Sequence, residues 1–64
     1  MQPHQQRVLE EQGELQTKCD RLATFIMGET FSGLPQRERD LLAMQLLLMR
    51  QYNDVLVERM KAWA

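Results

Sequence analysis

A run of nine uncharged residues, from Leu41 to Met49, constrains the fold of this chain more than any other feature. It lies within a much longer helical pattern that contains neither proline nor glycine. A helix in a two-helix protein buries about one stripe of its surface. Here apolar side chains occupy most of the circumference, at Leu41, Leu42, Met44, Leu46, Leu47, Leu48 and Met49. We therefore expect this helix to be covered on two or more sides, with other copies of the chain supplying the additional cover.

The length of the chain points in the same direction. Sixty-four residues make one small domain, and a core of that size is only marginally stable without a disulfide, a metal or oligomerisation. Cys19 is the only cysteine, which excludes an internal disulfide, and one cysteine with one histidine gives no metal-ligand spacing. Oligomerisation is the remaining means of stabilisation.

Two helices are predicted, over about residues 3–27 and 35–61. In the first, Val8, Leu15, Leu22 and Ile26 follow one another at steps of seven and four, which is the pattern of an amphipathic helix. The connection is short and therefore makes the helices antiparallel, with positions whose numbers total about 62 lying level. The predicted fold is a single all-α domain, an antiparallel two-helix hairpin that assembles into a homo-oligomer.

The second predicted helix carries two adjacent apolar stripes, and the sequence does not distinguish which of them packs on the first helix. We assign one set of side chains to the oligomer interface: Leu42, Leu46, Met49, Tyr52, Leu56 and Trp63. The two aromatic residues of this set are expected at the interface or in the core, with their polar atoms at the rim, although either could stack on a base.

The charge of the chain limits its partners. With 8 basic and 9 acidic residues it lacks the basic footprint of a non-specific DNA-binding protein, although a few converging cations could still hold a small anion. There is no signal peptide and no apolar run of about 18 residues, so we expect no membrane contact and a cytoplasmic location. His4 and Cys19 lie about 22 Å apart along one helix, which gives no catalytic pair. We expect a protein that is not an enzyme and binds no cofactor.

Three groups of polar residues have both a structural and a functional interpretation. The run from His4 through Gln5 to Arg7 is either a solvated first turn or a phosphate site, because the N–H groups at a helix start attract anions. Arg59 interrupts an apolar stripe and either extends to solvent from the edge of the core or contacts a phosphate or base. Lys18 is more typical of a surface residue than of a ligand contact.

The spaced pattern of residues resembles a known phage family. In the first half it comprises residues 4–9 (HQQRVL), Glu14-Leu15 and residues 21–26 (RLATFI). In the second half it comprises Phe31, Leu34-Pro35, Met49, Tyr52, Val55-Leu56 and Arg59. This pattern is similar to that of the helical-hairpin proteins that phages use as cyclic-nucleotide sponges against the CBASS and Thoeris defences.

The resemblance implies a compact homo-oligomer, typically a hexamer, that binds cyclic di- or trinucleotide immune signals between protomers without cleaving them. Sequestration of the signal keeps the host effector silent. The positions that match the ligand-binding residues of the family are His4, Gln5, Arg7, Lys18 and Arg59. His4 stands where relatives carry an aromatic residue. The sequence thus supports two hypotheses: a cyclic-nucleotide sponge in the cytoplasm of the host bacterium, or an oligomeric hairpin module that binds a host or phage protein.

Overall fold

The computed structural model describes residues 1–63, and these residues contain three helices and no strand. The helices are α1 (Pro3–Ile26), α2 (Glu29–Ser32) and α3 (Gln36–Lys61). The predicted all-α class is confirmed. The segment expected to be a plain connection, residues 28–34, contains the short helix α2, which the apolar pattern of the sequence did not indicate.

The two long helices begin and end where local chemistry favours it. Pro3 occupies the first turn of α1, where a missing N–H costs little, and the Gln5 side chain accepts a hydrogen bond from the N–H of Gln2 at 2.9 Å. α1 stops at Ile26, and the next N–H, that of Met27, donates to the Thr24 carbonyl at 3.2 Å. In α3 the charged side chains at both ends interact favourably with the helix dipole, since Glu38 lies in the first turn and basic side chains lie in the last.

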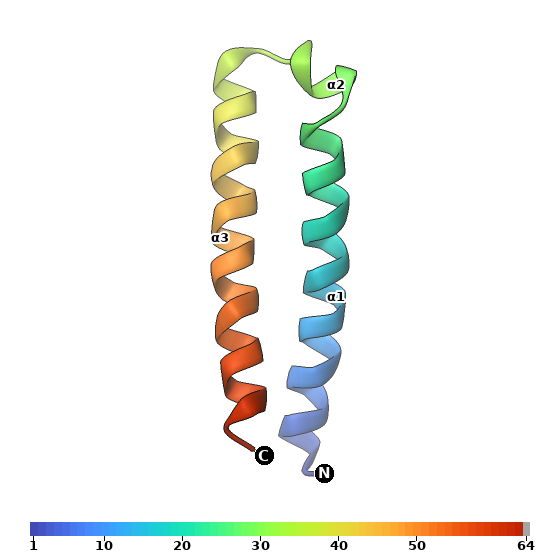
Figure 1. Cartoon of the computed structure of the whole chain (residues 1–64), viewed down its shortest axis with the longest axis vertical. Helices are drawn as coiled ribbons and strands as arrows, with labels where there is room; N and C mark the ends of the chain where they lie inside the picture. Colours follow the sequence, from blue (N-terminus) through green and yellow to red (C-terminus); the bar gives the residue numbers. More distant parts are fainter. Residues whose placement is uncertain (64) are drawn as a thin grey trace.

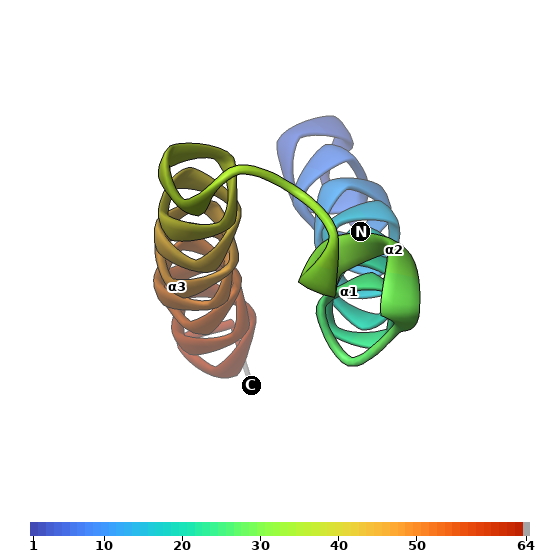
Figure 2. The same cartoon turned by 90° about the horizontal axis from the view of Figure 1, so that it is seen from above.

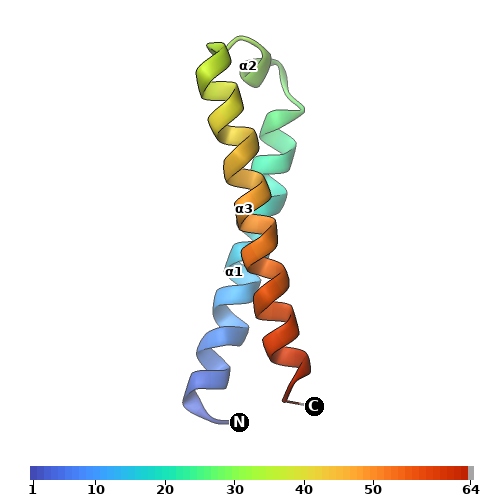
Figure 3. The same cartoon turned by 90° about the vertical axis from the view of Figure 1, so that its left-hand side faces the viewer.

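α1 and α3 lie side by side over most of the 46 Å length of the molecule, and the chain termini lie at the same end (Figures 1 and 3). α2 covers the opposite end of α1, as the view along the helices shows (Figure 2). There Phe31 packs edge-to-face against Phe25, with 6.4 Å between ring centroids and 81° between ring planes. The aromatic pair thus connects α2 to the last turn of α1.

The core between the long helices is small. Five side chains are buried: Val8, Leu15 and Cys19 from α1, and Leu46 and Leu56 from α3. Leu56 is the only one with no exposed surface at all. Half-buried side chains surround this cluster, namely Leu22, Ala23, Ile26, Met49, Met60 and Trp63. A core of this size is what the short chain led us to expect.

Side-chain hydrogen bonds between α1 and α3 define how the two helices are aligned. Asn53 accepts a hydrogen bond from Gln12 at 3.2 Å and donates one to Gln16 at 2.9 Å. On another side of the helix pair, the Tyr52 hydroxyl donates to a carboxylate oxygen of Glu11. Positions 11 and 52 therefore lie level, one residue from the register predicted by the sequence.

The residues that we had assigned to the oligomer interface differ in how far they are buried within a single chain. Leu46 and Leu56 are buried inside a single chain, and Met49 and Trp63 pack against the same core. Leu42 is half-buried, and Tyr52 alone of the set is exposed, at 45%. Leu46 and Leu56 therefore have little or no surface left to offer a second copy, whereas Tyr52 has the most of this set.

Candidate functional site

The contact between Glu11 and Tyr52 marks one side of the molecule, where α1 and α3 meet at the surface. Residues separated by four or seven positions lie on the same side of a helix. His4 and Arg7 precede Glu11 by seven and four positions, and Lys18 follows it by seven. Arg59 follows Tyr52 by seven. We call this side the Tyr52 face, and it contains His4, Arg7, Glu11, Lys18, Tyr52 and Arg59.

The cations of the Tyr52 face are available to a ligand. Arg7, Lys18 and Arg59 are all exposed. Within residues 1–63 the only ion pair joins Lys61 to Glu58 at 3.1 Å, so none of these three cations has a carboxylate within 4.0 Å. An anion approaching this face would therefore not have to displace an existing ion pair.

Tyr52 is the most perturbed titratable group on this face. The hydrogen bond to Glu11 has the largest effect, and it raises the pKa of Tyr52 above the ordinary tyrosine value of 10.0. Desolvation and the negative charge of Glu11 act in the same direction, whereas the positive charge of Arg59 opposes them. The three side chains are thus close enough to interact electrostatically, and Tyr52 remains a neutral hydrogen-bond donor at physiological pH.

The register of the helices brings only some of the predicted ligand residues together. In the alignment that pairs Glu11 with Tyr52, His4 lies level with Arg59, and Arg7 lies less than one turn further along α1. Lys18, by contrast, is about 16 Å from Arg7 along the helix axis, at 1.5 Å per residue. A single chain therefore places His4, Arg7 and Arg59 at its open end and leaves Lys18 apart from them.

Gln5, the fifth predicted ligand residue, lies on a different side of α1 from Glu11. It is half-buried, and its side-chain oxygen accepts the hydrogen bond from Gln2 that holds the start of the helix. Its local role is therefore structural.

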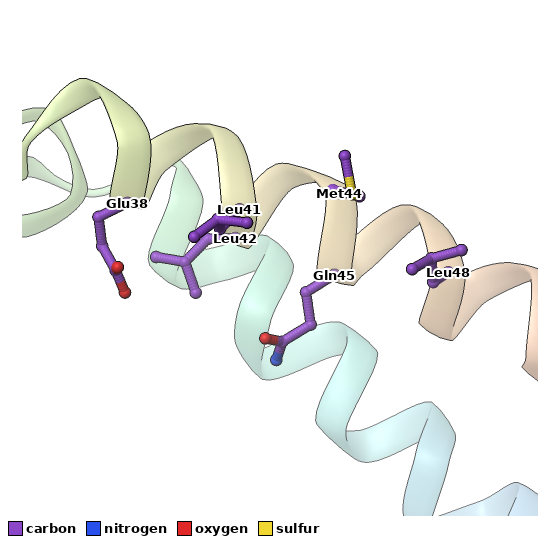
Figure 4. Close-up of a pocket in the computed structure, with 6 residues that line it drawn as sticks. All are labelled: Glu38, Leu41, Leu42, Met44, Gln45 and Leu48. Carbon is purple, nitrogen blue, oxygen red and sulfur yellow. The ribbon is translucent and has the colours of Figure 1, made fainter.

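α3 presents an apolar stripe next to the Tyr52 face, which we call the outer stripe and define as Leu41, Met44, Leu48 and Val55. These side chains are 41%, 55%, 57% and 55% exposed. A hollow of about 500 Å³ opens over the first part of the stripe (Figure 4), and its lining comes entirely from α3: Glu38, Leu41, Leu42, Met44, Gln45 and Leu48. Met44 points away from α1 in this view.

A second hollow, of about 430 Å³, lies toward the other end of the outer stripe. It is lined by Asp54, Val55, Glu58, Arg59 and Ala62. Arg59 therefore borders both the Tyr52 face and this hollow, which gives an apolar surface beside a guanidinium group that has no ion-pair partner within residues 1–63.

Sequence reasoning did not identify Glu11 as part of the face. It was not among the residues that the sequence singled out. The available signal was the antiparallel register, because positions 11 and 52 total 63 and any pair close to 62 was expected to lie level. Applying that rule to every polar residue of α1 would have paired Glu11 with Tyr52.

The fold and this face define a small all-helical protein in which two long helices pack along their length and leave cations and an apolar stripe exposed. The chain belongs to the Sequestin family, because the family model described as Sequestin matches residues 2–62. No curated protein and no solved structure matches the chain.

Two further properties of the described part of the chain bear on its ligands. Residues 1–63 contain no group of three or more histidine, cysteine, aspartate or glutamate side chains placed to hold a metal ion. Neither long helix has a stretch apolar enough to span a membrane within those residues.

Proposed function

We propose that this Sequestin-family chain is a phage anti-defence sponge that binds and sequesters cyclic di- or trinucleotide immune signals without cleaving them. The observation that carries the proposal is the family match over residues 2–62, since the name of the family indicates sequestration. The pattern shared with phage cyclic-nucleotide sponges supplies the ligand class. In this proposal the protein acts in the cytoplasm of the host bacterium as a homo-oligomer, typically a hexamer.

The Tyr52 face has the chemistry that such a ligand needs. Cyclic oligonucleotides present two or three phosphates, and arginine holds phosphate through charge-assisted, often bidentate, hydrogen bonds. Arg7 and Arg59 lie at the same end of the hairpin, with His4 level with Arg59 and able to donate a hydrogen bond or stack on a base. Exposed Tyr52 offers a second ring for stacking.

A complete site requires more than one copy of the chain. The net charge is only −1, and Lys18 lies about 16 Å along α1 from Arg7, too far to contact the same phosphate. Symmetry in an oligomer can bring Lys18 of one copy to the open end of another, so that cations from several chains surround one ligand. In this proposal the ligand is bound and not cleaved, which accords with the separation of Cys19, buried in the core, from His4 on the Tyr52 face.

The test is to replace Arg7 and Arg59 separately with alanine and to titrate each variant with a panel of cyclic di- and trinucleotides. Loss of a hydrogen bond to a charged group costs about 1.5–3 kcal/mol, so we expect each substitution to weaken binding by roughly 10- to 100-fold. Arg50→Ala is the matched control, since Arg50 is exposed but lies two positions before Tyr52, on another side of α3. Unchanged affinity in both variants would contradict the assignment of these residues.

The outer stripe favours a second candidate function, an oligomeric interaction module that binds a host or phage protein. That function predicts no affinity for any cyclic nucleotide. Thermal unfolding with the same ligand panel separates the two candidates, because a ligand at 100 times its dissociation constant stabilises a protein by about 2.7 kcal/mol. The absence of any shift with every member of the panel would favour the interaction module.

A further inference from the structure

Glu11 is the only acidic member of the Tyr52 face. On α1 it follows Arg7 by four residues, about 6 Å along the helix axis, and precedes Lys18 by seven. Glu11 is exposed, and within residues 1–63 it forms no ion pair with either of these cations or with Arg59. Its hydrogen-bond partner is instead the Tyr52 hydroxyl. A carboxylate that lies among cations without pairing to them keeps acceptor positions available to a ligand.

The other carboxylates of the two long helices near this face are placed differently. On α1, Glu10 and Glu14 fall on the side of Glu11 that faces away from the buried positions of the helix, and so away from α3. On α3, Asp54 and Glu58 line the second hollow of the outer stripe. Glu11 is therefore the carboxylate that a ligand bound between the helices on the Tyr52 face would meet.

An ionised carboxylate only accepts hydrogen bonds, so at this position it favours a donor and disfavours a phosphate. A cyclic ribonucleotide has two kinds of donor, the N–H groups of its bases and the free hydroxyl of each ribose. That hydroxyl is on the carbon atom next to the one that carries the phosphate ester. Because Arg7 lies one turn from Glu11, a phosphate bound by Arg7 brings the neighbouring hydroxyl toward the Glu11 carboxylate. Carboxylates accept hydrogen bonds from ribose hydroxyls in dinucleotide-binding folds in the same way.

Building on the proposed function, we propose that Glu11 is a specificity-determining residue whose carboxylate accepts a hydrogen bond from the ribose hydroxyl beside the phosphate that Arg7 binds. Tyr52 is a positioning residue, because its hydroxyl donates to one oxygen of Glu11 and leaves the other to the ligand. The negative charge of Glu11 weakens the attraction of the face for every phosphate, and a ligand that donates to Glu11 offsets this loss. The face therefore distinguishes ribonucleotides from deoxyribonucleotides, which lack the hydroxyl.

The test compares ligands that differ only in this hydroxyl, by isothermal titration calorimetry with the wild type and with Glu11→Ala. The probes are 3′,5′-linked cyclic di-AMP, cyclic di-GMP and cyclic tri-AMP, each with its 2′-deoxy counterpart. The wild type should bind the ribose form about 10- to 100-fold more tightly, which is the range for a hydrogen bond to a charged group. In Glu11→Ala this preference should fall about tenfold or more, while the affinity for the 2′-deoxy form rises because the repulsion of phosphate is lost. A preference that is the same in both proteins would overturn the proposal, since a carboxylate that acts through its charge alone changes both affinities by one factor.

Two further variants separate the hydrogen bond from the charge. Glu14→Ala removes the same charge from the next turn of α1, outside the contact with Tyr52, and should leave the ribose preference unchanged. Tyr52→Phe keeps the aromatic ring and removes the hydroxyl that positions Glu11, so it should lower the preference in the wild type and have no effect on it in Glu11→Ala. An effect of Tyr52→Phe that persists in Glu11→Ala would contradict the positioning role.

The same titrations distinguish failure of this inference from failure of the proposed function. Binding of any probe without a preference for its ribose form would contradict the role of Glu11 and leave the sponge function standing. The absence of binding by every probe, in both the ribose and the 2′-deoxy form, would contradict the sponge function and the role of Glu11 with it.

Discussion

Leu56 is the side chain on which the pairing of α1 with α3 depends most. It is 0% exposed, and its neighbours in the core come from both helices. Replacing a buried leucine with alanine costs about 2–5 kcal/mol, because apolar contacts are lost and a cavity remains. A chain of 64 residues has a total stability of roughly 3–10 kcal/mol at 0.05–0.15 kcal/mol per residue. Leu56→Ala should therefore remove a large fraction of the stability and leave a population that is substantially unfolded.

The assay is thermal unfolding followed by circular dichroism at a fixed protein concentration, with Leu47→Ala as the control. Leu47 lies nine positions before Leu56 on the far side of α3 and is 56% exposed. At about 4–8 °C per kcal/mol for a domain of this size, Leu56→Ala should lower Tm by at least about 8 °C. The control should stay within about 0.5 kcal/mol of the wild type. Equal losses in the two variants would refute the assignment of Leu56 to the intrachain core.

Three further predictions concern single substitutions. Tyr52 is the only tyrosine of the chain, so its titration can be followed by ultraviolet absorbance; Glu11→Gln removes the charge that favours the neutral phenol and should lower the pKa of Tyr52. Since the pKa of Tyr52 is raised in the folded state, its contribution to stability is present below pH 10 and is lost as the pH rises through the folded-state pKa. In Tyr52→Phe, the free energy of unfolding measured in urea should therefore decrease less at alkaline pH than it does in the wild type. Gly13→Ala should raise the free energy of unfolding by about 1 kcal/mol, because Gly13 lies within α1 and a Cβ atom there would meet nothing within 4 Å; an unchanged or lower stability would contradict that account.

The sequence predicted where the long helices lie, but it did not predict which side of α3 packs against α1. The period of the apolar residues predicted two long helices, and α1 and α3 occupy Pro3–Ile26 and Gln36–Lys61 against expectations of about 3–27 and 35–61. The short helix α2 was not predicted, because four residues are too few to develop a helical period.

Which stripe of α3 faces α1 could not be predicted because both stripes carry leucine and methionine at helical spacing. Hydrophobicity alone therefore gives two packings of similar energy. In the structure Asn53 lies at the spacing of the inner stripe and pairs with Gln12 and Gln16 of α1. A search for complementary polar residues across the helices would have been more informative than a count of apolar ones.

These amide hydrogen bonds also explain how the residues of the Tyr52 face, which are far apart in the sequence, keep fixed positions relative to one another. A seam of leucine and methionine tolerates sliding by one turn, because flexible apolar side chains repack with little loss. Sliding α3 by one turn would disrupt the part-buried hydrogen bond between Gln12 and Asn53, and a part-buried amide left without a partner costs about 1–3 kcal/mol. The amides therefore select one register, and that register keeps Glu11 opposite Tyr52 and His4 level with Arg59. The polar contacts thus determine where the cations of the Tyr52 face lie, while the apolar core contributes most of the stability.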